Sequence, residues 1–303
     1  MSDALPTRTL GRTGLKVTQL SFGAMEIRGP KVWNGRDPSE EDAERILNAV
    51  LDAGINFIDT AGCYGLSEAR IGRYISHRRD EFYLATKAGC NQVPTDDGRL
   101  DTPHIWNRET LLRNIDDSLT RMKTDHIDIW QLHNATPEQV EAGGLLKVME
   151  EVKAQGLVRF VSISSTLPHL DTYIDWGTFD TFQIPYSMLE PEHHDVITRA
   201  AEAGMGIIIR GGIAKGGPEG EVVRQERVNL WSAAGIEALL PDGMKPAELI
   251  LRYTLSHPHC HTTIVGTLNP DHLEENVAAA KRGALPPDLY EELTRRVAAA
   301  RDA

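Results

Sequence analysis

The sequence predicts an α/β fold: a closed (β/α)8 barrel, or TIM barrel, with an N-terminal β-hairpin and a C-terminal helix. Short β-branched or apolar runs alternate with longer amphipathic runs along the 303 residues. This alternation gives eight strands, each followed by a helix, as in a parallel barrel. No stretch has the composition of an interdomain linker. We therefore expect a single barrel domain over residues 1–303.

The first elements can be assigned from turn and capping residues. The stretch TRTLGRTGLKV indicates a hairpin that turns between Gly11 and Gly14. A strand is expected over residues 17–23 and another over residues 55–59. The helix between them covers residues 39–54, because Ser39 is a suitable N-cap and Gly54 a suitable stop.

The remaining elements continue the same alternation. Strands are expected over residues 82–87, 126–132, 158–163, 181–184, 205–210 and 262–266. Helices are expected over residues 67–78, 108–122, 145–156, 195–204 and 246–257, with a further short helix before strand 181–184.

The alternative to a barrel is a doubly wound open sheet. Its nucleotide-binding members carry a G-x-G-x-x-G turn after the first strand, which the junction SFGAMEIRG at residues 21–29 lacks. The long segments 88–107 and 211–244 follow strands. In a barrel they would rise above the C-terminal rim, where barrel enzymes bind their substrates.

Charge and composition restrict the classes of partner. The chain has 32 basic and 44 acidic residues and a net charge of -12, which repels phosphate backbones and anionic lipids. The N-terminus has no signal-peptide profile, and no apolar run reaches the about 18 residues of a spanning helix. We expect neither nucleic acid nor membrane as partner, a cytoplasmic location, and free thiols at the three cysteines.

Four polar residues fall at or just after the C-terminal ends of consecutive strands. Asp59 ends the second strand and Tyr64 follows it, Lys87 ends the third strand, and His133 follows the fourth. Each one alone has a plainer interpretation, because a charged residue at a strand end is usually just solvated. A barrel, however, would bring all four together at one rim.

These four side chains suit acid catalysis of hydride addition to a carbonyl. The reaction develops negative charge on the carbonyl oxygen, and Tyr64 could protonate it. A neighbouring Lys87 ammonium would lower the tyrosine pKa, and Asp59 would hold Lys87 in place. His133 could donate a hydrogen bond to the carbonyl oxygen.

The sequence resembles the aldo-keto reductase superfamily at these positions. GINFIDTAGCYGLSE (54–68) with IG (71–72) is similar to the family signature, and ATK and QLH resemble its lysine and histidine motifs. The resemblance runs from the hairpin to GTLNPDHLEEN (266–276). It implies hydride transfer between NAD(P)H and a carbonyl, with Asp59, Tyr64, Lys87 and His133 as the catalytic tetrad.

The resemblance also implies a set of coenzyme contacts. The nicotinamide end would lie near Gly23, Ala24, Met25 and Asp59, with its carboxamide held by Ser164, Ser165 and Gln183 and its ring stacked on Tyr186. The pyrophosphate would lie near Arg210, Gly211, Gly212 and Lys215. The adenosine end would contact Gly266, Thr267, His272, Glu275 and Asn276.

Several of these positions depart from the family pattern. Ser165 stands where the family usually has asparagine. Gly266 and His272 stand where NADP-selective members usually have lysine and arginine. NADP(H) is favoured on the general habit of the family, and NAD(H) is the alternative.

No intrinsic metal site is expected. His257, His259, Cys260 and His261 lie at the bottom of the barrel, and four ligands within five residues do not easily form a closed tetrahedral site. No base is evident in the sequence beside Cys63, so it is interpreted as a small packed or exposed side chain.

Two further readings compete with a carbonyl reductase or its reverse, an alcohol or sugar dehydrogenase. A nicotinamide-binding regulatory or sensor subunit is disfavoured by the intact tetrad. A carboxylate-based hydrolase lacks a suitable pair of acids. The long βα segments carry polar residues that hint at a carbonyl or polyol substrate such as a sugar, namely Arg28, Lys31, Asn34, Asn91 and Asp96. The oligomeric state is left open.

Overall fold

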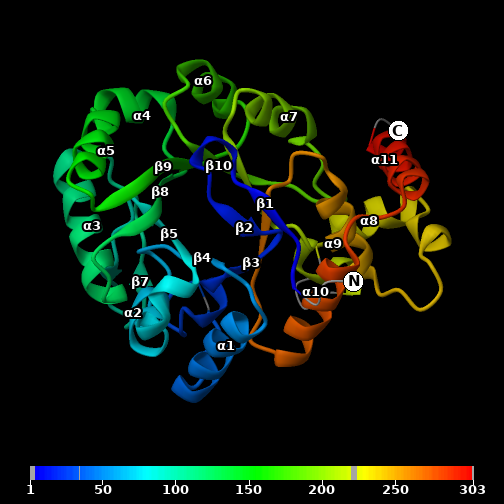
Figure 1. Ribbon diagram of the computed structural model, residues 1–303, viewed down its shortest axis with the longest axis horizontal. Helices are drawn as coiled ribbons and strands as arrows, with labels where there is room; N and C mark the ends of the chain where they lie inside the picture. Colours follow the sequence, from blue (N-terminus) through cyan, green and yellow to red (C-terminus); the bar gives the residue numbers. More distant parts are fainter. Residues whose placement is uncertain (1–3, 34, 220–223, 302–303) are drawn as a thin grey trace.

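Eight parallel strands close into a barrel in the computed structural model, which describes residues 4–33, 35–219 and 224–301 (Figure 1). In barrel order the strands are β3 (Leu20–Gly23), β4 (Phe57–Asp59), β5 (Tyr83–Ala88), β8 (Ile127–His133), β9 (Val158–Ser164), β10 (Thr181–Pro185), β11 (Gly206–Arg210) and β12 (Thr262–Val265). The barrel prediction is confirmed, and each strand lies within a few residues of its predicted position.

Helices surround the barrel and cover the outer face of its strands (Figure 1). They are α1 (Glu40–Asp52), α2 (Ser67–Tyr74), α3 (Arg108–Met122), α4 (Pro137–Ala142), α5 (Leu145–Ala154), α6 (His169–Trp176), α7 (His194–Glu202), α8 (Gln225–Ala233), α9 (Pro246–Ser256) and α10 (Pro270–Arg282). The predicted C-terminal helix is α11 (Pro287–Arg301), which packs on α8. None of the helices in the described ranges is both long and apolar enough to cross a bilayer.

The N-terminal hairpin pairs β1 (Thr7–Thr9) with antiparallel β2 (Lys16–Thr18). The strand predicted over residues 17–23 is thus two strands, because the chain changes partner at Gln19. The Gln19 amide donates to Pro6 of the hairpin, and its carbonyl accepts from Thr263 of the barrel. The hairpin therefore lies across one end of the barrel, as Figure 1 shows.

Side chains inside the barrel form two layers. Successive side chains of a strand point to opposite faces, so inward positions recur every second residue. An apolar layer packs against Leu10, Leu15 and Val17 of the hairpin and contains Phe57, Ala85, Ile129 and Ile208. Two residues further along the same strands stand Asp59, Lys87, Gln131 and Arg210. A polar layer is therefore built at the C-terminal end of the barrel.

Helix α1 begins and ends where its capping residues predict. The Ser39 hydroxyl accepts from the Asp42 amide at 3.0 Å, and the Asp42 carboxylate accepts from the Ser39 amide. This capping box satisfies two backbone donors that a helix start leaves unpaired. Gly54 then has φ 81°, a left-handed conformation that favours glycine and turns the chain into β4.

Candidate active site

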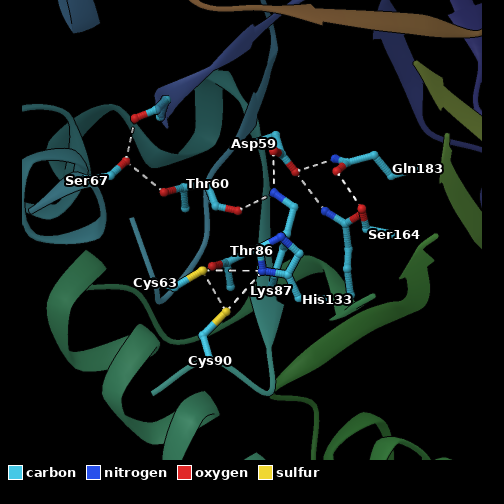
Figure 2. Close-up of polar contacts among 12 residues, drawn as sticks. Asp59, Thr60, Cys63, Ser67, Thr86, Lys87, Cys90, His133, Ser164 and Gln183 are labelled. Carbon is cyan, nitrogen blue, oxygen red and sulfur yellow. Dashed lines mark hydrogen bonds and ion pairs between the residues drawn. The ribbon is translucent and has the colours of Figure 1, made fainter. Parts of the chain in front are cut away.

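Three neighbouring barrel strands bring Asp59, Lys87 and His133 of the predicted tetrad together at the C-terminal rim (Figure 2). Asp59 ends β4, Lys87 is the penultimate residue of β5, and His133 ends β8. Because β4, β5 and β8 are adjacent in the barrel, these side chains share one face. Tyr64 lies in the loop after β4, with its ring centroid 4.9 Å from Lys87 Nζ.

Asp59 and Lys87 form a buried ion pair. Lys87 Nζ donates to Asp59 Oδ2 at 2.5 Å and to the Thr60 carbonyl at 2.7 Å. Asp59 Oδ1 accepts from the amides of Gln131 and Gln183 at 2.7 and 2.8 Å. Burial alone would lower the pKa of Lys87, but the interactions with Asp59, Tyr64 and Cys63 together exceed this effect and raise that pKa. The lysine therefore stays charged inside the barrel.

Tyr64 is a neutral phenol at neutral pH. Burial raises the pKa of Tyr64 to about 12, and this effect exceeds the lowering by the positive charge of Lys87. Lys87 does lower the pKa of Tyr64 as expected, but burial of the phenol, which the sequence does not show, has the larger effect, so the pKa lies above its usual value. A neutral phenol can donate a proton.

His133 is oriented by two cysteines. Its Nδ1 lies 3.3 Å from Cys63 Sγ and 3.1 Å from Cys90 Sγ. Burial lowers the pKa of His133, which favours the neutral ring. A potential base thus stands beside Cys63, contrary to the expectation from sequence, and His133 is 70 positions further along the chain.

The residues assigned to the carboxamide lie next to the tetrad. The Ser164 hydroxyl donates to Gln183 Oε1 at 3.0 Å, and the Ser165 amide donates to the Gln183 carbonyl. On the other side of the tetrad, Gly23 pairs in register with Asp59. Ala24 and Met25 follow Gly23 in a 3-10 turn, so the structure gathers these predicted residues around one end of the polar layer.

Tyr186 lies elsewhere. It is fully buried, its hydroxyl contacts His194 of α7 at 3.1 Å, and its ring packs against Tyr253 of α9 and against His257. Gln183 points into the barrel, so Tyr186, three residues later, points outward toward the helices. The prediction that Tyr186 stacks on the nicotinamide ring is therefore corrected.

Arg210 occupies the inward position at the end of β11. Within the described part of the chain its side chain donates no hydrogen bond and forms no ion pair, although it is largely enclosed. Burial lowers its pKa, while Tyr64, Glu190 and Asp59 oppose this effect. A guanidinium with five donors and no protein acceptor is suited to an anionic or carbonyl-bearing ligand at the rim.

The two glycines after Arg210 have structural roles. Gly211 has φ 74°, a left-handed conformation that favours glycine. A Cβ on Gly212 would clash with the Thr263 side chain, and the Gly212 carbonyl accepts from the Thr254 hydroxyl. Close packing against β12 and α9 is therefore sufficient to explain Gly212.

A cavity of about 620 Å³ extends from the rim toward α10. Seven predicted coenzyme contacts line it, namely Met25, Lys215, Gly266, Thr267, His272, Glu275 and Asn276. Three further cations, Arg28, Arg36 and Lys245, also line it, together with two acids that pair with them, Glu26 and Glu275.

The family model for the Aldo/keto reductase family matches residues 19–297, nearly the whole chain. The chain belongs to the aldo-keto reductase family. It is an oxidoreductase, and members of this family use nicotinamide coenzymes. Among known structures, the holo form of aldo-keto reductase AKR11C1 from Bacillus halodurans superposes with a TM-score of 0.83 at 29% identity, covering 96% of each chain.

Two relatives of this aldo-keto reductase are named for sugar chemistry. L-galactose dehydrogenase of Arabidopsis thaliana is 28% identical over 298 residues, covering 90% of this chain and 87% of the relative. The 6-dehydroglucose reductase of Novosphingobium aromaticivorans is 34% identical over 173 residues, covering 52% and 51%.

A second hollow of this aldo-keto reductase, of about 440 Å³, lies between its rim loops. The segment 88–107 folds into a small hairpin, β6 (Val93–Pro94) with β7 (Leu100–Asp101), whose Leu100 amide donates to the Lys31 carbonyl. Polar side chains of both loops line the hollow beside Trp33, including Lys31, Asp96, Asp97 and Arg99. Of the other polar residues noted in the sequence, Arg28 lines the larger cavity, Asn91 bonds to its own loop and to Arg113 of α3, and Asn34 lies outside the described residues.

Several residues of this site were missed from sequence. Gln131 could have been found, because it is the inward residue between Ile129 and His133 on β8. Lys245 precedes α9 and reaches the cavity only through packing against α10, where its Nζ contacts Glu275 at 2.5 Å. Cys90 and His104 carry no motif, and only the folded rim brings them to His133.

The histidines at the bottom of the barrel make structural contacts. His257 Nδ1 accepts from the His259 amide at 3.1 Å, and its Nε2 lies 3.3 Å from the His194 carbonyl. His261 Nδ1 accepts from the Ile207 amide at 2.9 Å. These hydrogen bonds use ring nitrogens that a metal would need.

Proposed function

We propose that this protein transfers hydride between a nicotinamide coenzyme and an aldehyde, ketone or sugar carbonyl and the corresponding alcohol, with Tyr64 as the general acid or base. One observation carries the proposal. A buried Lys87–Asp59 pair, whose carboxylate accepts from Gln131 and Gln183, lies beside a neutral Tyr64 at the rim of the barrel.

The chemistry of each residue follows from its environment. The coenzyme supplies the hydride when bound. Tyr64 donates its phenolic proton to the oxygen of the substrate, and the Lys87 ammonium stabilises the phenolate that remains. Neutral His133 donates a hydrogen bond from Nε2 to the same oxygen, because its Nδ1 faces the cysteines. Asp59 holds Lys87 through its hydrogen-bonded carboxylate, and the reverse reaction uses the same groups.

The polar layer and the larger cavity support the coenzyme assignment. Arg210 presents unused donors beside the carboxamide group of residues Ser164, Ser165 and Gln183. At the far end, Asn269 caps the N-terminus of α10 through its Oδ1, a position that favours a bound anion. Lys245 and His272 flank this helix start in the cavity. The start of α10, Lys245 and His272 together favour binding of a 2′-phosphate and therefore NADP(H), and NAD(H) is the alternative.

The proposed substrate is a small hydroxylated carbonyl compound or polyol. Its support is the hollow between the rim loops, whose lining carries both acidic and basic side chains. The names of the two sugar-related relatives point the same way. The net charge of -12 supports a protein that works without nucleic acid or membrane partners. The proposal further takes the chain as one barrel domain over residues 1–303 in the cytoplasm.

The competing proposal is a nicotinamide-binding sensor subunit with little turnover, and Tyr64→Phe distinguishes the two. Removing the phenolic proton is expected to lower kcat about 100-fold or more. Binding of NADPH, followed by tryptophan fluorescence, should remain within about twofold because the phenyl ring is kept. A wild-type protein that binds coenzyme but reduces no aldehyde, ketone or sugar in a broad panel would favour the sensor.

A further inference from the structure

Four metal-ligating side chains meet at the rim beside the tetrad. They are Cys63, Cys90, His104 and His133, and one ligand atom from each lies within 4.8 Å of all the others. The sequence predicted no metal here, because the four residues are spread over 71 positions and follow no ligand spacing. The fold creates the cluster.

The backbone fixes the positions of these four residues. Cys63, Cys90 and His133 follow or end the adjacent strands β4, β5 and β8. His104 comes from the returning arm of segment 88–107, where an antiparallel bridge pairs it with Cys90. Asn114 of α3 holds the start of this segment by accepting from the Gly89 amide and donating to the Cys90 carbonyl.

The distances between ligand atoms suit a tetrahedral ion. Cys63 Sγ and Cys90 Sγ lie 3.3 and 3.1 Å from His133 Nδ1, and Cys90 Sγ lies 3.6 Å from His104 Nε2. Zinc bonds of about 2.3 Å to sulfur and about 2.0 Å to nitrogen imply sulfur-to-nitrogen separations of about 3.5 Å. The two sulfurs, 2.8 Å apart, would need to separate by about 1 Å. Small rotations of the cysteine side chains supply this movement.

We propose that Cys63, Cys90, His104 and His133 bind one Zn²⁺ ion. Two thiolates and two neutral imidazoles neutralise its charge, and this soft donor set excludes Mg²⁺ and Ca²⁺, which prefer oxygen. Four protein ligands leave no open position for water or substrate, so the ion is structural and not a Lewis acid. The rings of His104 and Trp106 stack at 5.6 Å, which supports the exposed ligand from outside.

The ion would also fix the catalytic geometry of His133, a consequence that rests on the proposed function. A metal on Nδ1 leaves the proton of the neutral ring on Nε2. Within the described residues Nε2 has no hydrogen-bond partner, so it is available for the oxygen of the substrate. Zinc binding would then lock the tautomer that the proposed reaction requires.

The test uses Co²⁺ as a spectroscopic substitute for Zn²⁺ on the full-length protein, reduced and stripped with a chelator under anaerobic conditions. One Co²⁺ per chain is expected to produce thiolate charge-transfer absorption and tetrahedral ligand-field bands, and equimolar Zn²⁺ should displace it. With Zn²⁺ bound, ¹H–¹⁵N spectra of the imidazole rings should show the proton of His133 held on Nε2.

Matched variants locate the site. Cys90→Ser should reduce the charge-transfer band to half or less, whereas Cys260→Ser, also at a buried cysteine, should retain it in full. His104→Ala should weaken Co²⁺ binding by at least about tenfold, whereas His77→Ala, also at an exposed histidine, should not. Circular dichroism of each variant establishes that it is folded.

Three outcomes would overturn the zinc proposal. The first is a folded wild-type protein that gives no thiolate band. The second is a band of undiminished intensity in Cys90→Ser, which would place the ion elsewhere. The third is a Cys63–Cys90 disulfide in the isolated protein that, once reduced, still binds no Co²⁺. NADPH binding is measured on the same samples, so failure of the coenzyme assignment is separate from failure of the metal site.

Discussion

Asp59 and Lys87, on adjacent strands, form an ion pair in which Asp59 Oδ2 lies 2.5 Å from Lys87 Nζ. Both side chains are buried, with exposed fractions of only 2% and 1%. Burying two charges is costly unless each is paired and hydrogen-bonded. Gln131, Gln183 and the Thr60 carbonyl supply those further hydrogen bonds. The polar layer of the barrel is therefore one connected network, and a change in one member should be transmitted to Lys87.

Asp59→Asn is expected to damage both stability and catalysis. It leaves the Lys87 charge buried without its partner, which costs about 3 to 5 kcal/mol of unfolding free energy. The same change lowers the pKa of Lys87, because Asp59 is the charge that raises it, so the Tyr64 phenolate loses support. Urea unfolding and steady-state kinetics measure the two effects.

The double variant Asp59→Asn/Lys87→Met is the control for this pair. Removing both charges should recover part of the stability lost in Asp59→Asn but none of the activity. If the single and double variants unfold at the same urea concentration, the unpaired charge of Lys87 is not what destabilises Asp59→Asn.

Lys245→Ala tests the proposed preference for NADP(H). Lys245 lines the cavity beside α10 and contacts Glu275, so it can be shared with a 2′-phosphate. The Kd for NADPH is expected to rise about tenfold, because an ion pair to phosphate is worth about 1 to 2 kcal/mol. The Kd for NADH should change less than twofold in the same fluorescence titration.

Lys147→Ala, at an exposed lysine of α5, is the matched control and should alter neither Kd. Equal losses for NADPH and NADH in Lys245→Ala would assign Lys245 to the shared part of the coenzyme and remove the support for NADP(H). High salt should reduce the NADPH advantage of the wild type, since exposed charge pairs are screened.

Much of this architecture can be predicted from the periodicity of the sequence. The two-residue alternation on β4, β5 and β8 places Asp59, Lys87 and His133 inward, and the order of strands makes them neighbours. The same rule, applied from Gln183 to Tyr186, would have directed the tyrosine outward. That error came from the resemblance and not from the local pattern.

Other features depend on contacts between distant segments. The expected strand 17–23 is divided at Gln19 because the backbone of this residue bonds to two different segments, the hairpin on one side and β12 on the other. The pKa of Tyr64 depends on how deeply the phenol is buried, which no spacing encodes. The cysteine and histidine cluster requires loops after two strands and the end of a third to meet.

Gly72→Ala tests the packing of α2 against α3. An added Cβ would lie 2.7 Å from the Met122 Cα and would also clash with the Arg121 carbonyl. Backbone atoms cannot rotate away, so the variant should lose about 1 to 3 kcal/mol of unfolding free energy. Gly62→Ala is the control, because its Cβ would stay 3.7 Å from its nearest neighbour. A Gly72→Ala protein as stable as Gly62→Ala would show that α2 and α3 can separate at little cost.

His257 makes the barrel sensitive to acid. Burial lowers its pKa to about 3, and burial likewise lowers that of His261 to about 4. The unfolded chain binds a proton at each histidine below its usual pKa of about 6.5, whereas the folded protein does not. Stability is therefore fully present above that pKa and falls as the pH decreases toward the folded values.

Between pH 7.5 and pH 5, protonation of His257 in the unfolded chain alone should lower the unfolding free energy of the wild type by about 2 kcal/mol. His257→Asn keeps an acceptor for the His259 amide but cannot titrate, so its loss over the same interval should be smaller by that amount. His77→Asn, at an exposed position, controls for removal of a histidine. Urea unfolding at both pH values gives the comparison. Equal losses in wild type and His257→Asn would mean that the buried ring gains a proton without unfolding the barrel.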